Sequence, residues 1–511
     1  MNMFIIKKKQ NYLHLYFQKY KPLSMKLKKA INNLIPYLKN AYSLDLRALA
    51  CMRIGIALII LIDLFIRSLS IKAFFTDEGI LPLSILKLYN WNEMYFSFHA
   101  LNGELWWQII LFILNACCAF ALLIGYRTKV FSFICWVFLV SLQNRNPFIL
   151  QGGDDLLRLA LLWGIFLPWG ERYSLKKEST YSNTYFSIAN IGYLLLVFSV
   201  YFFSALLKTS PEWRSEGTAL YYALSLDQIR LPFGTFLYQF PNLLKILTPV
   251  VYYIELIAPL LFLLPFPKKL KLLGIICIAL LHLGISINIY VGLFFIIGLV
   301  TLIGLLPSEI MNWLELKFIK PQPIKIMETI SQKSTFIFEF IFSLKTIFLS
   351  FIIFYCLMLN LGVLKNFPYA LDINLIKFGS MFRLEQNWGM FSPYILKDDG
   401  YYVFSGLNKN NKAIDIKHNL NTVSFAKPIS VIEEFESDRW RKYSENYVFN
   451  NNNYMRPYYC NYLLKKWNAE NPFNQISELT IYFMKEISLP DYKTKPIEKN
   501  VVCNCNTTEI K

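Results

Sequence analysis

A single lysine follows a long uncharged stretch of the chain. The residues from Tyr185 to Leu207 include no acid and no base, and Lys208 ends this stretch. A lysine at the rim of a membrane helix can extend its ammonium group to the lipid headgroups, which is a structural role. An amine held away from water can instead lose its proton and act as a base. Lys208 is therefore a candidate catalytic base, with headgroup contact as the alternative interpretation.

Other ionisable residues also interrupt apolar segments. Asp63 and Arg67 are spaced by one helical turn, so that they can neutralise each other. Glu255 and His282 each lie in the middle of an apolar segment, without an obvious partner nearby in the sequence. An intramembrane charge costs at least ~2.5 kcal/mol, so we expect such residues to face the protein interior or a wet cavity. Such residues either form ion pairs that stabilise the fold or belong to a functional site. The full set is Arg53, Asp63, Arg67, Asp154, Asp155, Arg158, Glu255 and His282.

The composition places these residues in a membrane protein. Hydrophobic residues make up 55% of the 511 residues and charged residues only 17%, which excludes an ordinary soluble protein. The expected fold is a polytopic α-helical membrane protein of about nine transmembrane helices, followed by a C-terminal extracytoplasmic β-rich domain. The predicted spans cover residues 48–68, 105–125, 129–143, 155–169, 185–207, 242–265, 270–287, 290–307 and 343–363.

The basic residues predict the orientation. The first 46 residues contain nine lysines and one acid, Asp45, whereas the loop from Ile71 to Glu104 is slightly acidic. Basic loops lie on the cytoplasmic side of membrane proteins, so the N-terminus is predicted to be cytoplasmic and residues 364–511 to be outside, in a bacterial inner membrane. Residues 25–35 suit an interfacial helix on an anionic leaflet. These features account for much of the net charge of +18 without nucleic acid as a partner.

The chain divides into four predicted parts. Residues 1–46 form a basic, amphipathic leader, 47–315 a transmembrane core, 316–363 a cytoplasmic linker with the last transmembrane helix, and 364–511 the exported domain. Strands are expected at 401–405, 447–449 and 479–483, with one or two helices between 434 and 467. Cys460, Cys503 and Cys505 permit one disulfide and leave one thiol. The remaining cysteines, in apolar spans, form no metal pattern, and no metal site is predicted.

Several motifs resemble the horizontally transferred transmembrane (HTTM) family, which includes the vitamin K-dependent γ-glutamyl carboxylase. The resemblance covers roughly residues 45–410, and its central segment is the most specific part, because Tyr201, Lys208, Trp213 and Gly217 have the spacing seen around the carboxylase's catalytic lysine. The other matching motifs are Arg53 with Ile54-Gly-Ile-Ala57 and Asp63, Phe75-Thr-Asp-Glu-Gly-Ile-Leu-Pro82, Gly153-Asp-Asp-Leu-Leu-Arg158, Leu167-Pro-Trp169, His282 with Gly292-Leu-Phe294, and Trp388-Gly-Met390.

The resemblance implies a reaction and roles for residues. In the carboxylase a neutral lysine deprotonates a reduced quinone of the vitamin K type, whose reaction with oxygen yields a stronger base that removes a γ-proton from a peptide glutamate. The carbanion then takes up carbon dioxide. Lys208 would be the base and His282 a second catalytic residue. An ungapped count puts Gln151 where the carboxylase has a functional histidine. The pocket residues implied are Arg53, Asp63, Gln151, Asp154, Asp155, Arg158, Trp213 and Glu255.

Three functions are consistent with these observations. The first is a carboxylase-like enzyme that modifies a secreted peptide or a lipid-linked substrate at the outer leaflet of the lipid bilayer. The second is a non-catalytic membrane accessory protein for the maturation or export of a secreted peptide. The third is a transporter, suggested by the buried charges but weakened because no inverted repeat is visible in the sequence.

Overall fold

Six helices of the structure are long and apolar enough to cross a membrane. The computed structural model describes residues 36–175, 183–318 and 343–507, and this number applies to those ranges. All six coincide with predicted spans, which is compatible with a polytopic membrane protein. They are α2 (Leu46–Ser68), α5 (Leu105–Leu123), α8 (Ile188–Leu207), α12 (Pro241–Leu263), α13 (Lys268–Asn288) and α17 (Leu344–Gly362).

The three remaining predicted spans are also helical, but they are shorter or less apolar. α6 (Thr128–Arg145) packs against α7 (Gly152–Phe166), and most of the α7 side chains are buried. α14 (Phe294–Ile303) contacts α2, α7 and α13, and a bend of 97° separates it from α15 (Ser308–Phe318). If α14 and α15 are taken as one broken span, the described residues contain up to seven spans.

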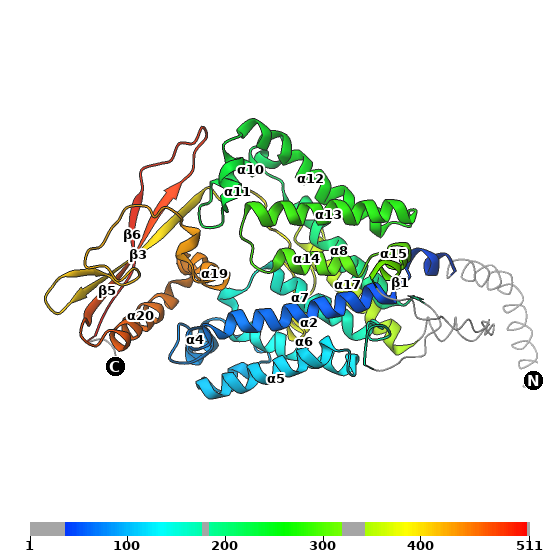
Figure 1. Cartoon of the computed structure of the whole chain (residues 1–511), viewed down its shortest axis with the longest axis horizontal. Coiled ribbons are helices and arrows are strands. Elements are labelled where there is room, and N and C mark those ends of the chain that lie inside the picture. The colour runs from blue at the N-terminus through cyan, green and yellow to red at the C-terminus, as the bar shows by residue number, and fades with distance from the viewer. Residues whose placement is uncertain (1–35, 176–182, 319–342, 508–511) are drawn as a thin grey trace, which may run out of the picture.

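Short elements connect the long helices. The largest group joins α8 to α12 and lies close to α12 (Figure 1). The short elements, with β1 before the first long helix and α18 after the last, are β1 (Leu44–Asp45), α3 (Ile71–Phe75), α4 (Leu83–Tyr89), η1 (Phe98–Ala100), η2 (Pro147–Ile149), β2 (Thr184–Tyr185), α9 (Pro211–Arg214), α10 (Ala219–Ser225), α11 (Pro232–Tyr238) and α18 (Ile373–Met381).

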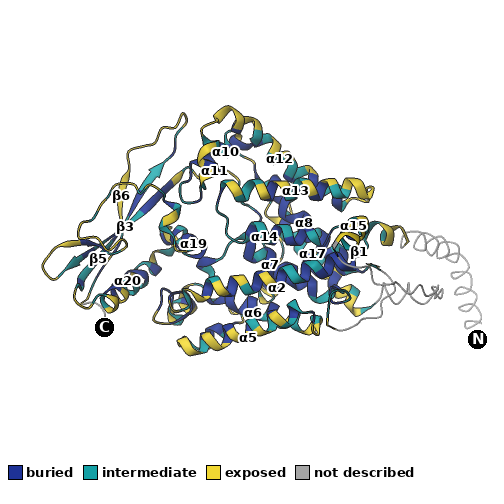
Figure 2. Ribbon diagram, in the orientation of Figure 1, coloured by how far each residue is buried: buried dark blue, intermediate teal, exposed yellow. Residues whose placement is uncertain are grey.

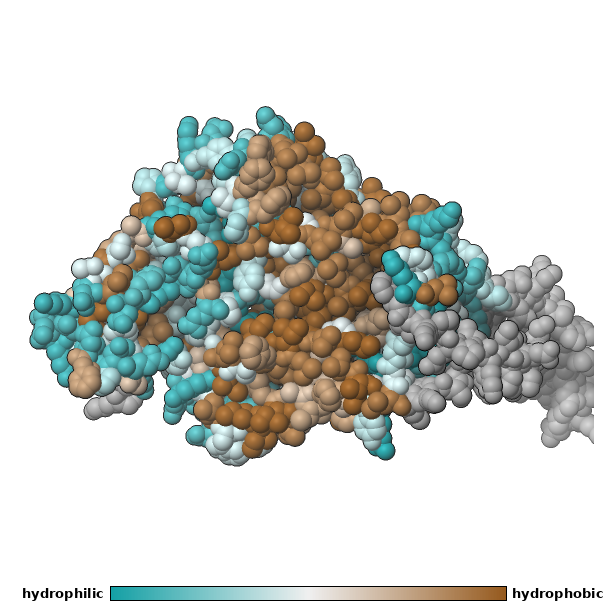
Figure 3. Space-filling model, viewed as in Figure 1, coloured by the Kyte–Doolittle hydropathy of each residue, from teal (hydrophilic) through white to brown (hydrophobic). Residues whose placement is uncertain are grey.

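The bundle exposes apolar side chains on its outer face. Figure 3 shows a nearly continuous hydrophobic surface over the helices, whereas Figure 2 shows buried residues along their inner faces. Phe65 of α2, Ile246 of α12 and Leu280 of α13 are each more than half exposed. A soluble protein rarely presents so large an apolar surface, so these faces suit contact with a lipid bilayer.

A separate antiparallel sheet forms the C-terminal domain at one end of the bundle (Figure 1). Its strand order is β4-β3-β5-β6, and α19 and α20 follow β4 in the chain. The Cys460–Cys505 disulfide joins α20 to β6 and leaves Cys503 as a free thiol, as predicted. The bounds are β3 (Asp398–Asn408), β4 (Ala413–Asp415), η3 (Ile432–Glu434), α19 (Asp438–Tyr447), η4 (Asn450–Met455), α20 (Arg456–Glu470), β5 (Ile476–Ile487) and β6 (Glu498–Asn506).

Two of the three strands expected in this domain are confirmed, and the third is wrong. Residues 401–405 lie in β3 and 479–483 in β5, whereas Tyr447 ends α19. The aromatic residues there follow a helical period, because Tyr443 and Tyr447 stack one turn apart with ring centroids separated by 5.9 Å. The interfacial helix expected at residues 25–35 and most of the linker after residue 316 lie outside the described residues.

Candidate functional site

Lys208 is buried at the exit of α8. Its ammonium nitrogen Nζ donates hydrogen bonds to Ser204 Oγ at 2.7 Å and to Glu255 Oε2 at 2.5 Å. Ser204 lies one turn earlier on α8, and Glu255 comes from the middle of α12. Only 2% of Lys208 is exposed. The structure therefore contradicts the alternative of headgroup contact and gives Lys208 an acidic partner that the sequence did not indicate.

Trp213 and the segment that leads to the C-terminal domain cover this lysine. The Lys208 ammonium lies 4.9 Å from the centroid of the Trp213 ring, and the indole Nε1 donates to the carbonyl oxygen of Phe391 at 2.8 Å. The backbone N–H of Ser210 donates to the carbonyl oxygen of Pro393 at 3.1 Å. The chain between α18 and β3 thus passes over the exit of α8 and closes it.

His282 contacts the same face of α8 through Tyr201. Its Nε2 lies 2.7 Å from the hydroxyl oxygen of Tyr201, which lies two turns before Lys208 on α8. Tyr201, Ser204 and Lys208 follow the spacing of one helix face. Gly298 lets α14 approach, because a Cβ there would lie 2.3 Å from the His282 ring. We call Lys208, Ser204, Glu255, Tyr201 and His282 the lysine cluster.

The His282 ring keeps one polar atom free. His282 is 1% exposed, and its Nδ1 has no hydrogen-bond partner among the described residues. The Phe294 ring packs beside the imidazole with centroids 5.4 Å apart. A buried nitrogen without a partner is costly, so it is a natural contact point for a polar group of a ligand.

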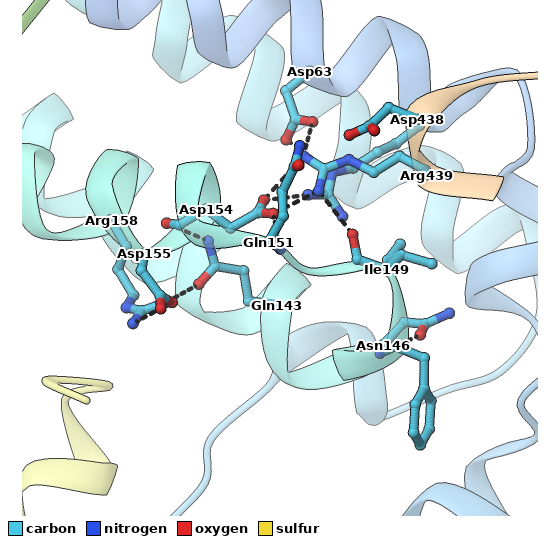
Figure 4. Close-up of polar contacts among 12 residues, drawn as sticks. Asp63, Gln143, Asn146, Ile149, Gln151, Asp154, Asp155, Arg158, Asp438 and Arg439 are labelled. Atoms are coloured by element: carbon cyan, nitrogen blue, oxygen red, sulfur yellow. Dashed lines mark hydrogen bonds and ion pairs between the residues drawn. The ribbon is translucent and has the colours of Figure 1, made fainter. Parts of the chain in front are cut away.

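A second group of charges lies between the bundle and the C-terminal domain (Figure 4). Arg67 binds Asp63 at 2.8 Å and Asp154 at 2.6 Å. Arg439, from α19, binds Asp63 at 2.7 Å and Asp154 at 2.5 Å. Each aspartate therefore contacts both arginines. We call these four residues the aspartate–arginine cluster, in which two positive charges balance two negative charges.

Arg439 is the member of this cluster that the sequence did not reveal. It lies in a polar stretch of α19, and its partners are more than 280 residues away in the chain. Burial opposes its charge, but Asp154 and Asp63 together raise the pKa of the guanidinium above its ordinary value. Its NH1 also donates to the carbonyl oxygen of Ile149 at 2.8 Å. The C-terminal domain is thus anchored to the bundle by a buried charge.

Gln151 and Asp154 begin α7, next to this cluster. The backbone N–H of Gln151 donates to Asp154 Oδ2 at 2.9 Å. The Gln151 amide and the Asp438 carboxylate both flank Gly292, where a Cβ would lie 2.6 Å from Gln151 Nε2 and 2.2 Å from Asp438 Oδ2. Gly292 has a positive φ of 57°, so both its space and its backbone favour glycine.

Asp155 and Arg158 form a third contact, so that they pair with each other. Arg158 NH2 lies 2.9 Å from Asp155 Oδ1, and NH1 lies 2.5 Å from Gln143 Oε1. Arg158 Nε also donates to the carbonyl oxygen of Arg383 at 2.7 Å. This pair therefore fastens the segment before the C-terminal domain to α7 and takes part in neither cluster.

Arg53 lies away from both clusters. Its NH2 donates to the carbonyl oxygen of Tyr173 at 2.5 Å, near the turn between α5 and α6. Arg53 precedes Asp63 by ten residues on α2, which corresponds to about 15 Å along a helix. The implied pocket residues therefore lie in three places. Glu255 and Trp213 lie beside Lys208. Asp63 and Asp154 bind Arg439, with Gln151 next to Asp154. Arg53 is remote from both clusters.

Comparison of the chain with protein-family models, curated proteins and solved structures finds no match.

Proposed function

We propose that the chain is an HTTM-type membrane enzyme that uses Lys208 as a base. The observation that supports this proposal best is the burial of the Lys208 amine beside Glu255, under the Trp213 ring. An amine that is held away from water can lose its proton and act as a base. The substrate proposed is a glutamate-bearing segment of a secreted peptide, which is carboxylated in the manner of the vitamin K-dependent enzyme.

Glu255 provides a route to a neutral amine. In the ion pair the proton belongs to Lys208, and its transfer over the 2.5 Å contact to Glu255 leaves an amine and a carboxylic acid. The proton stays within the pair, so that the two side chains together carry no net charge before or after the transfer. The amine can then accept a proton from an acidic hydroxyl group, while Ser204 holds Nζ in place.

The residues present fit a reduced quinone. The unpartnered Nδ1 of His282 can contact one ring oxygen, and Phe294 and Tyr201 offer ring faces beside it. When bound, the reduced quinone would supply the electrons for a reaction with oxygen that gives the stronger base. Tyr201 fixes the orientation of His282 through the contact at Nε2, so that Nδ1 points to the same place in each turnover.

The proposed topology has nine helices that cross or enter a bacterial inner membrane. The N-terminus is cytoplasmic and the C-terminal domain lies outside, which agrees with the basic loops. In support, the N-terminal end of α2 and the C-terminal sheet lie at opposite ends of the bundle (Figure 1). A reporter fused to the C-terminus that is active only outside the cytoplasm should be active. Activity of a cytoplasm-only reporter at this end would contradict the topology.

Incorporation of labelled bicarbonate into glutamate peptides tests the reaction. Membranes that contain the chain and a reduced quinone should label the peptide, and Lys208→Ala should reduce labelling to the background level. Lys245→Ala is the matched control, because Lys245 is exposed on α12, and it should label normally. Lys208→Ala labelling equal to that of the unmodified chain would remove Lys208 from the reaction.

A further inference from the structure

A cleft of about 270 Å³ lies within the C-terminal domain. One wall is the face of β3 that carries Tyr402 and Phe404, and the opposite wall is formed by α19 and α20. The stretch that includes η3 borders the opening. Except for Tyr402 and Phe404, its lining lies beyond the residues that the resemblance to a known family covers, and neither cluster described above contributes to it.

Aromatic rings line most of this cleft. The Tyr402 and Phe404 rings stack with centroids 6.0 Å apart, and the Trp440 and Tyr459 rings lie 5.9 Å apart on the other wall. Tyr462, from the next turn of α20, stands half-buried at the edge. Ring faces carry partial negative charge, so a wall of this kind attracts a cation as well as an apolar group.

The cleft already holds one cation of the chain itself. The Lys417 ammonium lies 5.7 Å from the Phe404 centroid and 5.9 Å from the Phe435 centroid. It also binds Glu434 at 2.8 Å, which neutralises that carboxylate. Lys417 therefore shows how the cleft accommodates an alkylammonium group, by ring faces together with one acid.

The lining also contains an acid without such a partner. Glu436 forms no ion pair with any described residue, and it lines the cleft together with Tyr459 and Tyr462. Glu470 lines the cleft as well. Because Lys417 is paired with Glu434, Lys466 is the remaining lining base, so that acids exceed bases.

We propose that this cleft binds an organic cation, with an alkylammonium or guanidinium group seated beside Glu436 and against the rings of Tyr459 and Tyr462. The ring faces and the acid supply the same two kinds of contact that Lys417 receives from Phe404, Phe435 and Glu434. The ligand is either a free small molecule or the basic side chain of a peptide. This binding does not depend on the chemistry proposed for Lys208.

Calorimetric titration of the full chain in detergent micelles tests the proposal. The probe is Nα-acetylarginine amide, and its neutral counterpart is Nα-acetylcitrulline amide. The arginine compound should bind, and Glu436→Gln should weaken its affinity by about fivefold, as expected for one partly exposed charge contact. Glu433→Gln is the matched control, because Glu433 is an exposed acid of η3 outside the cleft lining, and it should bind as the unmodified chain does.

A second variant and a peptide complete the test. Tyr462→Leu keeps the apolar contact but removes the ring face, so it should also weaken the arginine compound, independently of whether Glu436→Gln folds. A pentapeptide with one arginine should bind more tightly than its citrulline form. If the arginine pentapeptide binds more tightly than Nα-acetylarginine amide, the ligand is a peptide side chain. Equal affinities of these two compounds indicate a free cation. Equal binding of the charged and neutral probes, or unchanged binding in both variants, would overturn the proposal.

Discussion

The ammonium nitrogen of Lys208 lies 2.5 Å from Oε2 of Glu255, and this contact joins the exit of α8 to the middle of α12. Both side chains are nearly inaccessible to solvent, at 2% and 10% exposure. The contact therefore serves the structure and the proposed chemistry together, because the same carboxylate balances the buried amine and can receive its proton.

Removal of one partner of this pair should be costly. Lys208→Met leaves an unpaired carboxylate and Glu255→Gln an unpaired ammonium, and each should lower the free energy of unfolding by ~3–5 kcal/mol. The double variant Lys208→Met/Glu255→Gln leaves no charge and should lose much less than the sum of the two. Chemical unfolding of the four proteins in detergent measures this coupling. Additive losses would show that the two residues do not interact.

The Arg439 contacts should hold the C-terminal domain on the bundle. Arg439→Met leaves Asp63 and Asp154 to share Arg67 alone, so we expect a loss of ~3–5 kcal/mol and faster proteolytic cleavage before β3. Lys442→Ala, in the same helix, removes a partly exposed pair with Glu445 and should cost at most ~1 kcal/mol. Limited proteolysis with unfolding measurements compares the two. Equal protection in Arg439→Met and the unmodified chain would contradict the anchoring role.

Hydropathy alone predicts the helices of the bundle well. Its nine segments all correspond to helices, because a helix lets a run of apolar residues form all its backbone hydrogen bonds within the segment when it lies in lipid. It also identifies Glu255 and His282, since isolated polar residues in such runs are conspicuous. Local spacing predicts the Asp63–Arg67 contact, which is present. Structural pairing is one of the two alternatives for Asp155 and Arg158, and these residues form an ion pair.

Contacts between distant segments could not be predicted in this way. Glu255 is 47 residues from Lys208, and Arg439 is 285 residues from Asp154. The first pairing depends on how α8 packs on α12. The second depends on the docking of α19, whose charges look like those of any solvated helix. No periodicity in a single sequence reports either arrangement.

Asp399 should make the stability of the C-terminal domain depend on pH. Burial and then the charge of Asp227 raise the pKa of this carboxyl from 3.8 to about 7. The folded chain therefore keeps a proton that the unfolded chain releases between these two values, so stability is highest below pH 3.8 for this group and falls as pH rises through about 7.

Substitution of Asp399 tests this sign. Asp399→Asn keeps an oxygen acceptor for the backbone N–H of Gln228 but cannot titrate. The free energy of unfolding of this variant should therefore vary less with pH than that of the unmodified chain between 3.8 and about 7, the two pKa values of the carboxyl. Asp398→Asn is the control, because the Asp398 side chain is half exposed. Thermal unfolding across this range measures the effect, and an identical slope in Asp399→Asn would refute it.

The Cys460–Cys505 disulfide should stabilise the C-terminal domain by restricting its unfolded state. It spans 45 residues and joins α20 to β6, the strand at one edge of the sheet. Replacement of both cysteines by serine should lower the free energy of unfolding by ~2–5 kcal/mol, and a reducing agent should have the same effect on the unmodified chain.

Cys503→Ser removes the neighbouring free thiol and keeps the Cys460–Cys505 bond, so this control variant should retain the response to the reducing agent. Unfolding with and without reductant compares the three. If the reductant left the unmodified chain unchanged while the Cys460→Ser/Cys505→Ser chain was destabilised, the loss would come from the packing of the two side chains, because both are buried.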